Sequence, residues 1–225
     1  MCGRFALGIP RKRIQERFGL GEIPEAPDRY NIAPGQLVEA VVQAPEGRRL
    51  KLLKWGLVPS WAKDTAMGYK MINARGESVA EKPAFKAAMR RRRCLIPAQG
   101  FYEWSTEEGK RQPWFITSGT GEDVLAFAGL WEHYESPTGE IIESVAIITC
   151  AANGLIVPIH DRMPVIVEPE DDASWLDPGL ADPKEVADII LPRPWPAMRA
   201  YRVSTMVNSP KNESPELIDP IGESR

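Results

Sequence analysis

Two short apolar runs decide the fold class of this chain: VLAFAGLW at residues 124–131 and VAIITC at residues 145–150. Short runs of this kind are typical of strands that are buried on both faces. Prolines account for 21 of the 225 residues and are scattered along the whole length. Because proline interrupts helices and central strands, this scatter favours short strands joined by shaped loops. We therefore expect one mixed domain with a β core.

Elsewhere the hydrophobic pattern predicts a few further elements. Residues 11–18 predict a helix that ends at two nearby glycines, and residues 83–93 predict a helix opened by Pro83. Residues 51–58 predict a strand and residues 183–191 a third helix. The polar, proline-containing stretch from Asn208 onward is expected to lie extended on the surface. No linker separates two domains, so we expect a single domain.

Composition excludes several classes of protein. No run approaches the ~18 apolar residues that cross a bilayer, and the first residues lack the apolar stretch of a signal peptide. Three cysteines and two histidines, with no CxxC or HExxH spacing, speak against a disulfide scaffold and a metal site. Neither GxGxxG nor GxxxxGK[ST] occurs, so no nucleotide cofactor is expected. These features predict a soluble cytoplasmic protein without cofactors and without membrane contact.

The net charge of −3 is unevenly distributed. Residues 1–113 carry 21 Lys/Arg and 12 Asp/Glu, whereas residues 114–225 carry 7 and 19. A basic first half of this kind favours an anionic partner.

Cys2 follows the initiator methionine and precedes Gly3. Removal of Met1 would give Cys2 a free α-amine, with a pKa of ~7.7–8.0, two carbons from its thiol, with a pKa of ~8.5. Together these groups can capture an aldehyde as an imine and then as a five-membered thiazolidine. Position alone favours an incidental thiol. A third interpretation is a glutamine amidotransferase, since some of these enzymes also begin Met-Cys-Gly and use the thiolate as acyl acceptor.

Further polar residues lie in apolar or proline-rich surroundings, where partial desolvation is expected. Glu103 lies between Tyr102 and Trp104, which should raise its pKa and suit it to general acid–base work. His160 lies in a turn bracketed by prolines and is a candidate proton shuttle. An exposed strand-edge carboxylate and a hydrogen-bonded structural histidine are the alternatives for these two residues.

Other candidates have side chains that suit nucleic acid. Asn73 and Arg75 lie two residues apart and share a face if the segment is extended, where they could hold a sugar hydroxyl and a phosphate. Arg4 and Arg162 each neighbour a candidate reactive residue and could extend a phosphate track. Trp55 and Trp61 could stack on bases of a single strand, and Trp61 is the stronger candidate because it adjoins a turn. We interpret His133 as structural, and Cys94 and Cys150 as buried thiols.

Together the motifs resemble one protein family. The sequence is similar to the SRAP (SOS response-associated peptidase) family of abasic-site processing proteins from residue 1 to about Leu217, which implies a domain over residues 1–217 and a tail over residues 218–225. The resemblance is carried, in order along the chain, by MCGRF (1–5), YNIAP (30–34), WGLVP (55–59), NARGE (73–77), RCLIP (93–97), GFYEW (100–104) and IHDRMP (159–164). With the predicted elements it implies an α+β fold, a single compact domain with a mixed, mainly antiparallel, barrel-like β core flanked by short helices.

The same resemblance implies a function and assigns roles. It implies a monomer, associated with the nucleoid or replication fork, that binds single-stranded DNA containing an abasic site, forms a reversible thiazolidine crosslink through Cys2 and processes its own Met1, with an associated lyase reaction. The implied catalytic residues are Cys2, Asn73, Glu103 and His160, and the implied DNA-binding residues are Arg4, Arg75, Arg162 and Trp61. The alternatives are the amidotransferase and a module that binds single-stranded DNA without covalent chemistry.

Overall fold

Strand β10 (Ile141–Ala151) organises the molecule, which is a computed structural model that describes residues 2–119, 121 and 123–222. It pairs antiparallel with β9 (Leu125–Glu135) and parallel with β4 (Gly47–Trp55). The ring continues from β4 through β3 (Leu37–Ala44) and β6 (Arg93–Ala98) back to β9. These five strands close a mixed barrel in which only the β10–β4 pair is parallel. The predicted barrel-like, mainly antiparallel core is confirmed.

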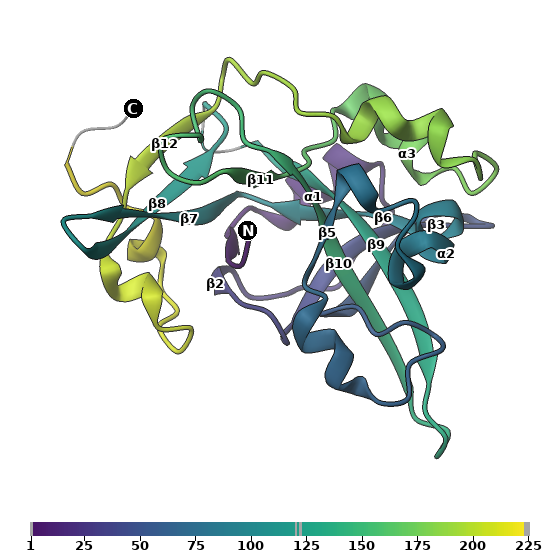
Figure 1. The fold of residues 1–225 in the computed structure, drawn as a ribbon. Coiled ribbons are helices and arrows are strands. Elements are labelled where there is room, and N and C mark those ends of the chain that lie inside the picture. Colours follow the sequence, from purple (N-terminus) through teal and green to yellow (C-terminus); the bar gives the residue numbers. More distant parts are fainter. Residues whose placement is uncertain (1, 120, 122, 223–225) are drawn as a thin grey trace.

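A second sheet stands beside the barrel (Figure 1). It is antiparallel throughout and has the order β12 (Arg199–Arg202), β8 (Lys110–Thr117), β7 (Gly100–Glu107), β1 (Phe5–Leu7), β2 (Arg29–Ile32). The chain passes from β6 of the barrel into β7 across one residue. Phe5 and Phe101 from this sheet both pack edge-on against Phe127 of the barrel, with ring centroids 5.9 Å apart in each pair. The two sheets therefore share one core.

Short helices flank the sheets, as expected. Helix α1 (Arg11–Phe18) has the predicted bounds, and it ends at Gly19 with a φ of 62°. Helix α2 (Pro83–Arg91) ends two residues before the prediction because Arg93 already begins β6. Helix α3 (Asp172–Leu176) was not predicted. No helix among the described residues is long and apolar enough to cross a membrane.

Several predicted boundaries are wrong, each for a local reason. The strand predicted over residues 51–58 is β4, which begins at Gly47 and stops at Trp55 because Gly56 takes a φ of 130°. Residues 183–190 form a 3-10 helix rather than an α-helix. The stretch from Asn208 is not simply extended, since Pro215–Ile218 is a 3-10 helix that buries Leu217. Two short strands, β5 (Asn73–Arg75) and β11 (Arg162–Pro164), extend the sheets. Of the strands described, only β4, β9 and β10 were predicted. Four further 3-10 helices were not predicted: Thr65–Lys70, Gly76–Ser78, Pro169–Asp171 and Thr205–Asn208.

A substitution at Gly56 would show how much the close packing of the loop after β4 contributes to stability. Its N–H donates to the Val145 carbonyl, and a Cβ at this position would lie 2.6 Å from the Gly68 carbonyl oxygen. Because the φ of 130° also disfavours any side chain, Gly56→Ala should lower the free energy of unfolding by about 2 kcal/mol or more. Urea unfolding followed by tryptophan fluorescence measures it. The control Gly154→Ala meets open space and should stay within about 0.5 kcal/mol of wild type; equal losses would contradict the constraint.

Candidate functional site

Cys2 lies where the two sheets meet, directly before β1. The residue is fully buried, and its carbonyl accepts a hydrogen bond of 2.8 Å from the Nδ2 of Asn73. Asn73 begins β5, which pairs with β10. The bond therefore links the segment that precedes β1 to the barrel. Burial raises the pKa of the Cys2 thiol far above its usual range, and the nearby Glu103 carboxylate acts in the same direction, while a hydrogen bond from the Arg4 backbone opposes them. The thiol is therefore neutral in this arrangement.

Glu103 lies on β7, opposite Trp114 of β8, and is only 2% exposed. Burial raises the pKa of its carboxyl to about 7, and the charge of Asp161 adds to the rise while that of Arg111 opposes it. The desolvation that its aromatic neighbours predict is confirmed. A carboxyl with this pKa can donate and accept protons near neutral pH, as a general acid–base group must.

His160 faces Glu103 from the turn before β11. Its Nδ1 accepts a 2.9 Å hydrogen bond from the Arg162 backbone N–H, which places the proton of the neutral ring on Nε2. That Nε2 lies 4.0 Å from the Glu103 Oε2. Burial lowers the pKa of His160, although the Asp161 carboxylate, 2.9 Å from Nδ1, favours the charged ring. Burial is the largest of these effects, so the neutral ring predominates near pH 7.

The three candidate arginines differ in how far the protein already uses their donors. Arg162 donates to both carboxylate oxygens of Glu77, at 2.5 and 3.0 Å, and to the Thr149 carbonyl at 2.6 Å. Arg4 donates to the Asn31 Oδ1 at 2.6 Å and to the Val207 carbonyl at 2.8 Å. The side chain of Arg75 is exposed, so of the three its guanidinium is the most available to an external phosphate.

The aromatic candidates separate clearly. Trp61 is 57% exposed, so its ring is open to solvent. Trp55 is 1% exposed, and its indole N–H donates to the Ile72 carbonyl. The interpretation of Trp55 as a stacking surface is therefore wrong, because the closed barrel takes its ring into the core. Cys94 and Cys150 are buried, as expected. His133 lies outside this site, on β9, 3.9 Å from Glu143.

An open cavity of about 520 Å³ exposes the edge of this cluster. Three of its lining residues are candidates from the sequence, namely Arg4, Glu103 and His160, and Gly3 lies beside them. Three others were not singled out for a role, namely Trp104, Arg111 and Asn208. Trp104 carried no sign beyond its place in the GFYEW motif, Asn208 only begins the polar C-terminal stretch, and Arg111 lies in an ordinary polar run. Only the pairing of β7 with β8 brings Arg111 beside Trp104.

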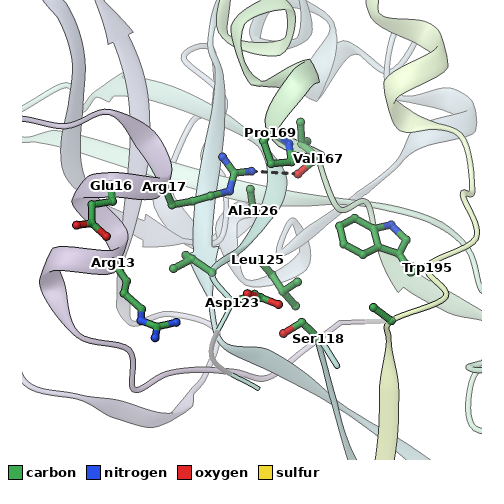
Figure 2. Close-up of a pocket in the computed structure, with 12 residues that line it drawn as sticks. Arg13, Glu16, Arg17, Ser118, Asp123, Leu125, Ala126, Val167, Pro169 and Trp195 are labelled. Carbon is green, nitrogen blue, oxygen red and sulfur yellow. Dashed lines mark hydrogen bonds between the residues drawn. The ribbon is translucent and has the colours of Figure 1, made fainter. Parts of the chain in front are cut away.

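A larger cavity, of about 640 Å³, lies away from this cluster (Figure 2). Its lining is largely apolar, including Leu125, Val167 and Trp195, and it contains none of the candidate residues. Arg17 at its edge donates to the Val167 carbonyl and pairs with the buried Asp172. The larger of these two cavities therefore lies apart from the candidate residues. Among the described residues, no cluster of three His, Cys, Asp or Glu side chains could hold a metal ion.

Comparison with known proteins agrees with this geometry. The family described as "SOS response associated peptidase (SRAP)" matches residues 1–210. The chain is 42% identical over 222 residues to the abasic site processing protein YoqW of Bacillus subtilis (strain 168), covering 97% of this chain and 99% of YoqW. It is 30% identical to the abasic site processing protein HMCES of Rattus norvegicus, covering 98% of this chain and 76% of HMCES.

Solved structures show the same fold. A crystal structure of a protein from Bacteroides thetaiotaomicron superposes with a TM-score of 0.87 at 24% identity and covers 98% of this chain and 100% of that one. A second structure, from Bordetella bronchiseptica, gives a TM-score of 0.79 at 26% identity and covers 90% of this chain and all of that one.

The raised pKa of Glu103 predicts a pH-dependent stability. Because it exceeds the ordinary value of 4.5, the folded protein holds a proton that the unfolded chain releases between about pH 4.5 and 7. Stability from this group is therefore lost as the pH rises through that window. Relative to wild type, Glu103→Gln should gain about 3 kcal/mol of unfolding free energy between pH 4.5 and 8. Urea unfolding at several pH values tests this. The exposed Glu135→Gln is the control, and parallel pH profiles for all three proteins would refute the prediction.

Proposed function

This chain belongs to the SOS response associated peptidase (SRAP) family, and we propose that it acts on abasic sites in single-stranded DNA by forming a covalent thiazolidine link through Cys2. The observation that carries the proposal is the convergence of Cys2, Asn73, Glu103 and His160 from both sheets on one place. The relatives YoqW and HMCES are named abasic site processing proteins, which supplies the substrate.

The chemistry begins with the release of Met1, which gives Cys2 a free α-amine. A ring-opened abasic sugar presents an aldehyde at C1′. The amine adds to C1′ to give a carbinolamine, which loses water to form an imine. The thiol then adds across the C=N bond, so that sulfur bonds to C1′ and its proton passes to nitrogen. One water leaves overall, and no electrons are exchanged with another molecule.

The neighbouring side chains suit the proton transfers of this sequence. Glu103 is half protonated near pH 7, so it can protonate the departing hydroxyl as an acid and then receive the thiol proton as a base. The Nε2–H of His160 can donate to the sugar ring oxygen during ring opening, and the same group can assist the reverse reaction. Asn73, which holds the Cys2 carbonyl, fixes the direction in which amine and thiol point.

DNA binding completes the proposal. Arg75 would contact a phosphate directly, since its guanidinium is exposed. Arg162 would need to share its guanidinium with Glu77, and Arg4 would share its own with Asn31. Trp61 would stack on a base. The removal of Met1 by the protein itself and a lyase reaction through the imine belong to the same proposal, as does action as a monomer.

Covalent capture is tested with mature protein and single-stranded DNA that carries one abasic site. A band that survives denaturing electrophoresis is expected with wild type and with Cys94→Ala, because Cys94 is buried in the barrel. Cys2→Ala, or undamaged DNA, should give less than 1% of that product. A crosslink that persists in Cys2→Ala would overturn the assignment. Steady ammonia release from glutamine would favour the amidotransferase instead, and salt-sensitive binding without a covalent band would favour a non-covalent module.

Self-processing is tested by intact mass. Wild type expressed in a host that lacks methionine aminopeptidase activity should lose the mass of one methionine, because Glu103 lies beside Cys2 and can assist hydrolysis. Glu103→Gln should retain it, and Glu107→Gln on the same strand should lose it. Retention of methionine by all three proteins would assign its removal to another enzyme.

A further inference from the structure

The part of the cavity beyond Glu103 is bounded by a tryptophan that is held in one orientation. The indole N–H of Trp104 donates a 2.7 Å hydrogen bond to the Oδ1 of Asn208. Trp104 is half-buried on β7, directly after Glu103, and Asn208 ends a 3-10 helix 104 residues further along the chain. Successive residues of a strand point to opposite faces, so Trp104 would be expected to point away from the face of Glu103. The hydrogen bond to Asn208 accounts for the place of the Trp104 ring at the same cavity.

Arg111 adds a positive charge to the same end of the cavity. Its guanidinium carbon lies 5.2 Å from the centroid of the Trp104 ring, a cation–π distance. The side chain is exposed, and among the described residues no hydrogen bond or ion pair occupies its N–H donors. Arg4, which lines the same cavity, already donates hydrogen bonds to the Asn31 Oδ1 and the Val207 carbonyl. Arg111 is therefore the cation of this cavity that is most available to an anion.

We infer that Trp104, Arg111 and Asn208 form a subsite for the nucleotide next to the abasic sugar. The inference rests on the proposed function. The cavity is continuous from Glu103 and His160 to Trp104 and Arg111, so a strand with its abasic sugar at Glu103 passes Trp104 on one side of the lesion. The base of that nucleotide stacks on the Trp104–Arg111 pair, and its phosphate accepts hydrogen bonds from Arg111. Asn208 is a positioning residue that holds the indole.

A second arginine–tryptophan pair shows what distinguishes this one. Arg202 lies 5.4 Å from the centroid of Trp114, a similar distance. However, Trp114 is 2% exposed and Arg202 is paired with Glu107 at 2.7 Å, so neither group is offered to a ligand, and neither lines the cavity. Arg202→Ala is consequently a matched control for Arg111→Ala.

The test uses three single-stranded oligonucleotides with one abasic site each. One has normal neighbours, and in the other two the 5′ or the 3′ neighbour is replaced by a tetrahydrofuran residue, which lacks a base and cannot crosslink. With limiting protein, removal of one of the two bases should slow wild-type crosslinking by about 5- to 100-fold. Trp104→Ala should crosslink all three at similar rates, and Trp104→Phe should restore the dependence on that base.

The charge is tested separately. Arg111→Ala should reduce the slope of log rate against log salt concentration by about 0.7, as expected for one lost phosphate contact on a single strand, whereas Arg202→Ala should leave it unchanged. If wild type crosslinks but no base matters, or if Trp104→Ala keeps the wild-type dependence, the subsite is wrong while the proposed function stands. If wild type forms no crosslink with any abasic oligonucleotide, the proposed function itself fails.

Discussion

Strand β10 is the constraint on which this structure depends, because it pairs with four other strands. Its first part closes the barrel through β9 and β4, and its last part carries β5 on one side and β11 on the other. The residues on those two short strands therefore share one template. Asn73 and Arg75 take their places from β5, and the backbone N–H that fixes His160 belongs to Arg162, the first residue of β11. A strand of eleven residues thus sets the barrel and half of the site together.

The other half of the candidate site comes from the neighbouring sheet. Where the two sheets meet, polar side chains lose their contact with water. Cys2 and Glu103 are both withdrawn from water, so each favours its neutral form. A neutral carboxyl can be kept beside a neutral thiol without the repulsion that two anions would bring. Burial thus favours the protonated forms of both groups, and the proposed addition reaction would move these protons. The same burial makes the Cys2 thiol less reactive toward oxidants, since the thiolate is the reactive form.

Sequence patterns predicted the parts of this molecule that depend on neighbouring residues. The helix over residues 11–18, the two buried runs of β9 and β10 and the raised pKa of Glu103 all follow from local composition. Long-range pairing decided the rest. From the sequence Trp55 is a candidate stacking surface, although a weaker one than Trp61, and only the closed barrel shows that its ring is buried. The donors of Arg162 look free until Glu77 is placed beside them. Arg111 and Asn208 carry no local signal at all, because only the β7–β8 pairing and the returning C-terminal segment bring them to Trp104.

The contacts of Arg4 and Asn31 give the chain an order of assembly. Arg4 donates to the Val207 carbonyl, and Asn31 donates to the carbonyls of Ser209 and Asn212. The N-terminal segment leaves the ribosome first, yet Val207, the partner of Arg4, lies 203 residues further along the chain. Until that later segment has been made, the side chains of Arg4 and Asn31 on the β1–β2 edge can form these hydrogen bonds only with water. The Cys2 thiol is thus made well before the segment that encloses its neighbour Arg4, and these surroundings are complete only after residues 207–212 have been synthesised.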